Sequence, residues 1–379
     1  MVIGILLPLS TTYPLIGRQF TDGLTSCLEE NNIHHSIIIK KESIGFGGDE
    51  KDVFAKAEKL LISDDVDVLI AYVDEKVVSI LSPLVQATGK LMIVVNPGAN
   101  YPINWIPQTS VARISLQHAF CCWLSGGLAA KSDNGQAVMS STFYDCGYMH
   151  TAGMVQNFTD SGGEIVFNYI NKQAYDEAFD INELDTFLQA NHSCQNLLCT
   201  FDEKAALLFY KRLSAIQTVQ PLHVFASPMM LQPSALERNE DGFPFSIKGF
   251  IPWYADIQNE ANQTFTKSCK IPPTIFSLLG WEAALVINEI MKSNSRNFAD
   301  GEAVVVHLKN SPFQSPRGEM MMDEETQIYI APVSKVSVGK GSPVINMMEQ
   351  SELKEQWNTF TKMPTDGAEA GWTNTYLCY

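Results

Sequence analysis

The sequence is short of positive charge, long apolar runs and paired cysteine motifs, and each shortage excludes a class of protein. Lysine and arginine number 26 against 42 aspartate and glutamate residues, so the formal net charge is −16. Such a chain repels the phosphates of nucleic acids and anionic lipids, so nucleic acid is not an expected partner. Charged residues make up only 18% and hydrophobic residues 45% of the 379 residues, which favours folded domains over disorder.

No apolar stretch reaches the roughly 18 residues that a membrane-spanning helix needs. The run at 66–73 (VDVLIAYV) is among the most apolar and ends within eight residues. The opening segment MVIGILLPLS lacks the basic leader and the cleavage site of a secretory signal. We therefore expect no membrane insertion of this chain, and either a cytoplasmic protein or one whose leader has been cut away.

Motifs for metals, nucleotides and nucleophiles are missing as well. The eight cysteines form no C-x-x-C pair, and we expect most of them to be buried thiols; Cys194 and Cys199 are near enough in sequence to bridge a short loop. The His34-His35 pair precedes an expected strand, where neighbouring side chains point to opposite faces and do not share one ion. No phosphate-binding glycine motif and no G-x-S-x-G elbow occurs. We expect no metal and no cofactor.

Hydrophobic periodicity predicts an α/β fold of two doubly wound parallel sheets. Continuous apolar runs alternate with segments of helical spacing, the pattern of right-handed βαβ units. The expected strands are 2–7, 36–41, 66–72, 91–95, 136–140, 164–169, 196–200, 222–226 and 247–252. Between them lie a helix starting at Ile16 and helices at 50–62, 76–88, 116–130, 147–160, 180–190 and 203–216; further helices at 275–291, 300–309 and 350–361 and a hairpin at 318–338 follow.

Ligands of open parallel sheets bind beyond the carboxyl ends of the strands, and this rule selects the candidate site. The loops at those ends are rich in hydroxyl, amide and aromatic groups, which suit a small polar molecule. The candidate ligand-binding residues are Ser10, Thr11, Tyr13, Tyr72, Asp74, Asn96, Pro97, Gly98, Ala99, Tyr144, Phe201, Asp202 and Ser227.

Acidic residues at the same strand ends allow a different reading. Asp74 and Asp202 form a conceivable acid/base pair, which would make the chain a hydrolase or isomerase. Neither has an oriented nucleophile or base in the sequence, so we expect no enzyme. For Glu75, Asp145 and Glu203, helix capping is the default expectation.

Several motifs, in order, resemble the type I periplasmic binding proteins of the branched-chain amino-acid transport class. IGILLPLSTTYPLIGRQFTDGL looks like the family's first strand, P-x-S loop and first helix, and GKLMIVVNPGAN like its fourth strand and Pro-small-small turn. STFYDCGYMHTAGM resembles the start of the second domain, and SPFQSPRGEMMMDEETQ a late segment in which Gly318 leads to a strand and Asp323. The likeness spans about residues 2–338.

The resemblance implies two lobes joined by a three-crossover hinge, with crossovers near 114–117, 250–253 and 331–334. Lobe one then comprises 1–115 and 253–331, and lobe two comprises 116–252 and 332–379, with a C-terminal extension from about 340 wrapped on the surface. It also implies a solute-binding protein that takes an amino acid or related small polar molecule to the membrane subunits of an ABC transporter. Such a protein works in the periplasm or outside the cell, in some cases anchored by a lipid on a leader segment.

The resemblance carries over to individual residues only in part. Ser10 and Tyr13 fall on the first-loop contacts, Gly98–Asn100 on the turn that receives an amino-acid carboxylate, and Phe201-Asp202 on an aromatic loop of lobe two. Where amino-acid binders place a hydroxyl for the carboxylate, this chain has Asp74-Glu75-Lys76. Where many place an acid for the ammonium, it has Ser227-Pro228. Like charges repel at short range, so these departures count against a plain α-amino acid and favour a cationic or hydroxyl-rich group near Asp74 or Asp202.

A ligand-sensing receptor or regulator domain on the same fold is the main alternative. A repressor would need a DNA-binding helix-turn-helix before the sheet, but the first strand begins at Val2 and the chain is acidic. A sensor without DNA contact stays open at this point.

Overall fold

The computed structural model describes residues 1–379 except 103–104, 133–134, 143–147, 173–178, 237–241, 293–299, 340–342 and 364–379. The described chain divides into two compact units, each built on one sheet. Unit 1 comprises Met1–Leu116 and Ala255–Ala331, and unit 2 comprises Gln117–Tyr254 and residues 332–363. The chain therefore passes between the units after Leu116, Tyr254 and Ala331.

Unit 1 has an eight-stranded sheet in the order β11-β12-β13-β5-β4-β3-β1-β2. Strands β1 to β5 and β13 are parallel to their neighbours in this series, while β12 runs antiparallel to β13 and β11 to β12. The strands are β1 (Val2–Leu7), β2 (Ile38–Ser43), β3 (Val68–Tyr72), β4 (Leu91–Asn96), β5 (Val111–Ser115), β11 (Phe313–Ser315), β12 (Gly318–Met322) and β13 (Ile328–Ile330). The continuous apolar sequences of β3 and β4 are explained by burial on both faces.

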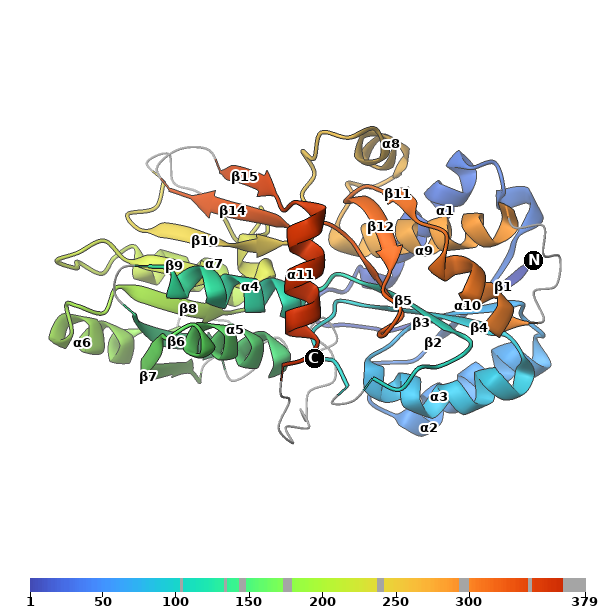
Figure 1. Ribbon diagram of the computed structural model, residues 1–379, viewed down its shortest axis with the longest axis horizontal. Coiled ribbons are helices and arrows are strands. Elements are labelled where there is room, and N and C mark those ends of the chain that lie inside the picture. The colour runs from blue at the N-terminus through green and yellow to red at the C-terminus, as the bar shows by residue number, and fades with distance from the viewer. Residues whose placement is uncertain are drawn as a thin grey trace. The chain divides into compact units, whose positions relative to one another are not determined.

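Helices cover both faces of the unit 1 sheet (Figure 1). One face packs on α2 (Glu50–Glu58), which continues into the π-helical turn Lys59–Ser63, and on α3 (Glu75–Thr88). The other face packs on α9 (Ile275–Lys292) and α10 (Gly301–Lys309), with α1 (Ile16–Glu30) against α9 and α8 (Glu260–Ser268) against α1. Two glycines let α1 and α9 approach closely, since a Cβ on Gly280 would lie 2.0 Å from the Phe20 carbonyl oxygen and one on Gly23 would lie 1.8 Å from that of Ser277.

Unit 2 has a seven-stranded sheet in the order β15-β14-β10-β9-β8-β6-β7. Strands β6 to β10 pair in parallel, and β14 and β15 add an antiparallel edge. The strands are β6 (Gln136–Thr142), β7 (Glu164–Asn171), β8 (Asn196–Thr200), β9 (His223–Ala226), β10 (Ser246–Ile251), β14 (Ser334–Val338) and β15 (Val344–Met347). The helices are α4 (His118–Ala130), α5 (Tyr148–Asp160), α6 (Asn182–Ala190), α7 (Glu203–Leu213) and α11 (Gln350–Phe360).

The C-terminal part of unit 2 is integrated into its fold. Strand β15 pairs with β14 at the sheet edge, and α11 crosses α4 (Figure 1). Trp357 and Phe360 are buried against Phe120, with ring centroids 5.3 and 5.4 Å away. The extension from about 340 was predicted to wrap on the surface, but its described residues instead supply a strand of the sheet and buried core side chains. Its last residues, 364–379, lie outside the described part of the chain.

The predicted α/β class with two doubly wound, mainly parallel sheets is confirmed, whereas some elements were not predicted and the hairpin is wrong. Strand β5 was not predicted, and its five residues include the charged Arg113. Helix α8 was not predicted, because its sequence EANQTFTKS is mostly polar. The stretch 318–338 is not one hairpin: β12 and β13 pair in unit 1, whereas β14 joins the sheet of unit 2.

Candidate functional site

The loops after β1 and β4 bring predicted residues to the carboxyl edge of the unit 1 sheet. After β1, the Ser10 hydroxyl oxygen accepts a hydrogen bond from the backbone N–H of Tyr13 at 3.0 Å, which fixes a tight turn. Ser10 is buried and Thr11 is exposed. The Tyr13 ring packs on Phe276 of α9, with centroids 5.2 Å apart. This loop is therefore packed against α9, with the Ser10 hydroxyl buried and the Thr11 side chain exposed.

The turn after β4 is built around Asn96 and Gly98. The Asn96 side-chain oxygen accepts from the Gly98 backbone N–H at 3.0 Å, and Gly98 adopts a φ of 68°, a left-handed value that glycine reaches without strain. Pro97, Gly98 and Ala99 are buried. The Asn96 amide nitrogen lies 3.4 Å from the Val73 carbonyl oxygen, which ties this turn to the loop after β3.

Asp74 is the N-cap of α3 and contacts the β4 turn. Its Oδ1 accepts from the backbone N–H of Lys76 at 3.2 Å, and its Oδ2 accepts from the Asn100 amide at 3.1 Å. Burial raises the pKa of Asp74 to about 7, although these two hydrogen bonds favour the charged form. The Asp74 carboxyl group is therefore poised to change charge near neutral pH.

Tyr72, the last residue of β3, is fully buried. Its ring packs on Phe20 of α1 at a centroid distance of 5.7 Å, and burial raises the pKa of its hydroxyl well above the ordinary value. No described residue hydrogen-bonds this hydroxyl. Tyr72 is therefore a core residue that packs against α1 below the loop after β3.

A buried ion pair, which the sequence did not predict, lies next to Asp74. The Arg113 Nε atom on β5 is 3.1 and 3.2 Å from the two carboxylate oxygens of Glu75, and these side chains are only 4% and 7% exposed. Arg113 also donates to the Gln108 side-chain oxygen at 2.7 Å and to the Thr326 carbonyl oxygen at 3.2 Å. This network fixes the start of α3 against β5. The expectation that Glu75 and Glu203 cap helices is wrong, because Asp74 and Asp202 occupy the N-cap positions.

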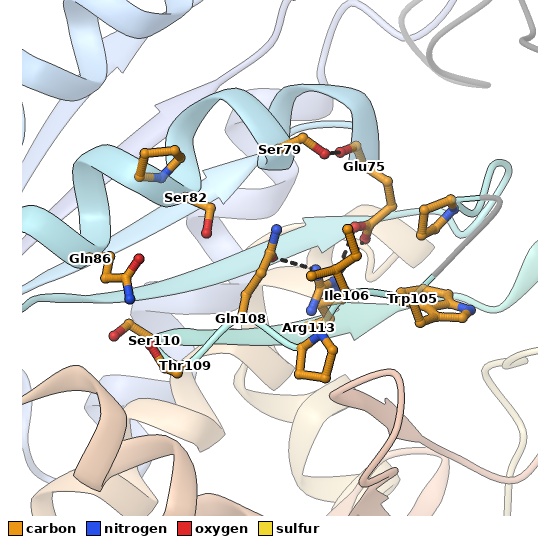
Figure 2. A pocket seen from close by; sticks show the side chains of 13 residues that line it. Glu75, Ser79, Ser82, Gln86, Trp105, Ile106, Gln108, Thr109, Ser110 and Arg113 are labelled. Carbon is orange, nitrogen blue, oxygen red and sulfur yellow. Dashed lines mark hydrogen bonds and ion pairs between the residues drawn. The ribbon is translucent and has the colours of Figure 1, made fainter.

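A cavity of about 350 Å³ extends from this ion pair along α3 (Figure 2). Figure 2 shows Ser79, Ser82 and Gln86 on α3 facing Gln108 and the neighbouring Thr109 and Ser110 across it. Trp105 closes one end, with its ring centroid 5.6 Å from the Arg113 guanidinium carbon. Its size and polar lining suit a small molecule. Among the residues that line it, none is one of the thirteen candidates from the sequence.

In unit 2, Phe201, Asp202 and Ser227 lie at neighbouring strand ends. Asp202 is the N-cap of α7, and its Oδ1 accepts from the backbone N–H groups of Lys204 and Ala205 at 2.9 and 3.0 Å. Ser227 is fully buried and its hydroxyl lies 3.5 Å from the Phe201 carbonyl oxygen.

The Phe201 ring belongs to the core of unit 2. It is fully buried, with its centroid 4.5 Å from that of Phe209 and 6.1 Å from that of Phe179. The ring therefore supports the loop rather than forming its surface. Tyr144, the remaining candidate, lies outside the described residues, as does Asp145.

The two predicted acids are thus arranged as helix caps, one in each unit. In the described chain, no group of three His, Cys, Asp or Glu side chains is placed to hold a metal ion. The His34 and His35 side chains were expected to point to opposite faces at the start of a strand. This is wrong, because both residues lie in a 3-10 turn (His34–Ser36) with ring centroids 3.6 Å apart.

No described helix has the length and apolar character to cross a membrane.

Comparison with known proteins agrees with this fold. A family model described as periplasmic binding protein matches residues 1–342. A benzoate-bound solute-binding protein of an ABC transporter from R. palustris superposes with a TM-score of 0.70 at 22% identity, covering 91% of this chain and 95% of that one. A leucine-binding protein from Thermotoga maritima gives 0.66 at 15%, covering 93% and 99%. No curated protein sequence matches.

Proposed function

Because the chain belongs to the periplasmic binding protein family, we propose that it captures a small polar molecule for uptake by the membrane subunits of an ABC transporter. The family match over residues 1–342 carries this proposal, and the polar loops at the carboxyl ends of both sheets support it. The family and the similar structures are binding proteins, and the two candidate acids serve as helix caps. We therefore expect no turnover of the bound molecule.

The candidate ligand site comprises the loops carrying Ser10, Asp74 and Asn96 in unit 1 and those carrying Asp202 and Ser227 in unit 2. In this proposal the lobes are 1–115 with 253–331 and 116–252 with 332–379, and they close on the ligand about the three crossovers. The two parts of the candidate site lie on separate lobes, so that binding and closure are coupled.

We place a cationic or hydroxyl-rich group of the ligand near Asp74 or Asp202. Similar structures hold aromatic carboxylates such as benzoate and 4-hydroxybenzoate, and another is a leucine-binding protein, so the fold alone does not set the ligand class. An ionised Asp74 repels a carboxylate and attracts a cation, whereas a neutral Asp74 donates a hydrogen bond to a hydroxyl oxygen.

Mass spectrometry of the small molecule that co-purifies with the chain tests the proposed function. The released compound is identified and its binding is then measured by calorimetry, with L-leucine and 4-hydroxybenzoate as comparison ligands. We expect a cationic or polyhydroxylated compound to bind with 1:1 stoichiometry. A protein that converts the compound during the titration would contradict a binding function.

Substitution of the candidate acids tests the site. Asp74→Asn and Asp202→Asn both keep a side chain that caps a helix but remove its charge, so we expect each to weaken binding by about 1.5–3 kcal/mol if it bonds the ligand. Ser82→Ala, which changes the separate cavity along α3, is the matched control and should bind normally. Unchanged affinity in both aspartate variants would leave these acids as caps alone, and a loss only in Ser82→Ala would move the site to the cavity.

We place the working protein in the periplasm or outside the cell, where uptake begins, either free or anchored by a lipid. Fractionation of cells that express the native gene tests this compartment. We expect the protein in the periplasmic or membrane-associated fraction; recovery in the cytoplasm alone would favour a ligand sensor instead.

A further inference from the structure

The segment after α8 is fastened to α1 of the same unit by side-chain contacts. The Ser268 hydroxyl donates to a Glu30 carboxylate oxygen at 2.9 Å, and the backbone N–H of Lys270 donates to the Asp22 carboxylate at 3.1 Å. Cys269 lies between these two anchored residues. Lys270 also forms an ion pair with Glu29 at 2.8 Å, and the backbone N–H of Ile271 reaches Asp22 at 3.3 Å.

Cys27 lies on α1 between the positions that receive these bonds. It is fully buried, one helical turn before Glu30, and the Asn31 amide lies 3.5 Å from its sulfur. Burial raises the pKa of Cys27 well above its ordinary value, and the nearby Cys269 thiol adds to the rise. Burial likewise raises the pKa of Cys269 to about 12. The bonds of Ser268 to Glu30 and of Lys270 to Asp22 therefore hold Cys269 over the part of α1 that contains Cys27.

The two cysteines differ in exposure. Cys269 is the C-cap of α8, has extended backbone angles and is partly exposed. Cys27 is fully buried within α1. A disulfide needs its two residues close together, and the hydrogen bonds of Ser268 and Lys270 to α1 place Cys269 against the helix that carries Cys27.

We propose that Cys27 and Cys269 form a disulfide that fastens the α8–α9 connection to α1. Each thiol loses a proton, one S–S bond forms, and the two electrons pass to a disulfide oxidant such as oxidised glutathione, whose own S–S bond breaks to give two thiols. The loop that the bond closes runs from residue 27 to residue 269 and so contains the whole of Gln117–Tyr254, the first chain segment of unit 2. Such a long loop gives the cross-link a large restraint on the unfolded chain.

The other described cysteines are placed differently. Cys121 and Cys122 are successive residues buried on α4, and Cys199 is fully buried within β8. Cys194 and Cys199, whose spacing would allow a short-loop bridge, are free thiols in this structure, as are Cys27 and Cys269.

Peptide mapping under non-reducing conditions tests the proposal. The full chain is incubated with a glutathione redox buffer, both as the native protein and during refolding from denaturant, and remaining thiols are then blocked. We expect a linked peptide pair containing Cys27 and Cys269 and a melting temperature about 5–10 °C above that of the reduced protein. Cys269→Ser should abolish both effects, whereas Cys121→Ser, the matched control, should retain them.

Recovery of Cys27 and Cys269 as blocked thiols under both oxidation conditions would overturn the proposal. So would a linkage of Cys269 to any other cysteine. Because the assay uses no ligand, its outcome is independent of the proposed transport function.

Discussion

At the scale of single residues, the unusual carboxyl group is that of Asp74. Its pKa of about 7 lies above the roughly 3.9 of a free aspartate, so between these values the folded chain holds a proton that the unfolded chain has released. The free energy of unfolding therefore falls as the pH rises through this window and stays constant above it. This decrease in the free energy of unfolding is the cost of burying the charged Asp74 carboxylate. In the proposed function, a cationic ligand group offsets that cost.

Asp74→Asn should remove this pH dependence while keeping the α3 cap. Between pH 4.5 and pH 8, we expect the free energy of unfolding of the variant to rise by about 2 kcal/mol relative to that of the wild type. This is less than the full pKa shift implies, because the Asp74 side chain is half-buried. Urea denaturation at several pH values measures the difference. Asp49→Asn, at the exposed cap of α2, controls for the exchange itself. Parallel pH profiles for Asp74→Asn and the wild type would contradict the assignment.

Residue roles were predictable from the sequence only where a local rule applied. The loops of Ser10, Asn96 and Ser227 do lie at the carboxyl ends of strands, as the carboxyl-end rule predicts, and their role in binding stays a prediction. It did not show that the Phe201 ring turns into the core, because a strand-end position leaves the direction of a side chain open. The Glu75–Arg113 pair had no sequence signal, since its partners are far apart in the chain and meet only through β5 and α3.

At the scale of elements, close packing of α1 on α9 depends on glycine. A Cβ on Gly280 would lie 2.0 Å from the Phe20 carbonyl oxygen, a backbone atom that cannot turn away. Gly280→Ala should therefore separate the helices and lower the free energy of unfolding by about 1–3 kcal/mol, despite the higher helix propensity of alanine.

Chemical denaturation at constant pH measures this effect, with Gly17→Ala on the same helix pair as control. A Cβ on Gly17 would lie 3.9 Å from a Leu7 methyl group, an ordinary contact, so this variant should be neutral or slightly stabilised. Equal stability of both variants would show that the interface tolerates the extra carbon.

The elements that the sequence missed share a physical reason. Strand β5 is short and contains Arg113, whose charge is acceptable there only because Glu75 lies opposite. Helix α8 is amphipathic over nine residues but polar overall, and Phe265 is its main buried anchor. In both cases tertiary contacts, and not local periodicity, stabilise the element.

At the scale of the whole molecule, the described part of the chain passes between its units after Leu116, Tyr254 and Ala331. Two buried networks hold the end of β5 before the first crossing. Arg317 is fully buried, pairs with Glu282 at 2.6 Å and donates to the Ser115 carbonyl oxygen at 3.1 Å, while Arg113 is held by Glu75. These contacts hold the end of β5 in place within unit 1. We therefore expect hinge motion to occur in the crossing segments and not within β5.

Small-angle X-ray scattering, with and without a saturating amount of the compound identified by mass spectrometry, tests whether the two lobes close on a ligand. A ligand that bonds both lobes favours the closed form by its differential affinity for it, so the radius of gyration should decrease on binding. The variant Asp74→Asn at the same ligand concentration should remain nearer the unliganded profile. An identical scattering profile of the wild type at saturation would contradict capture by closure of two lobes.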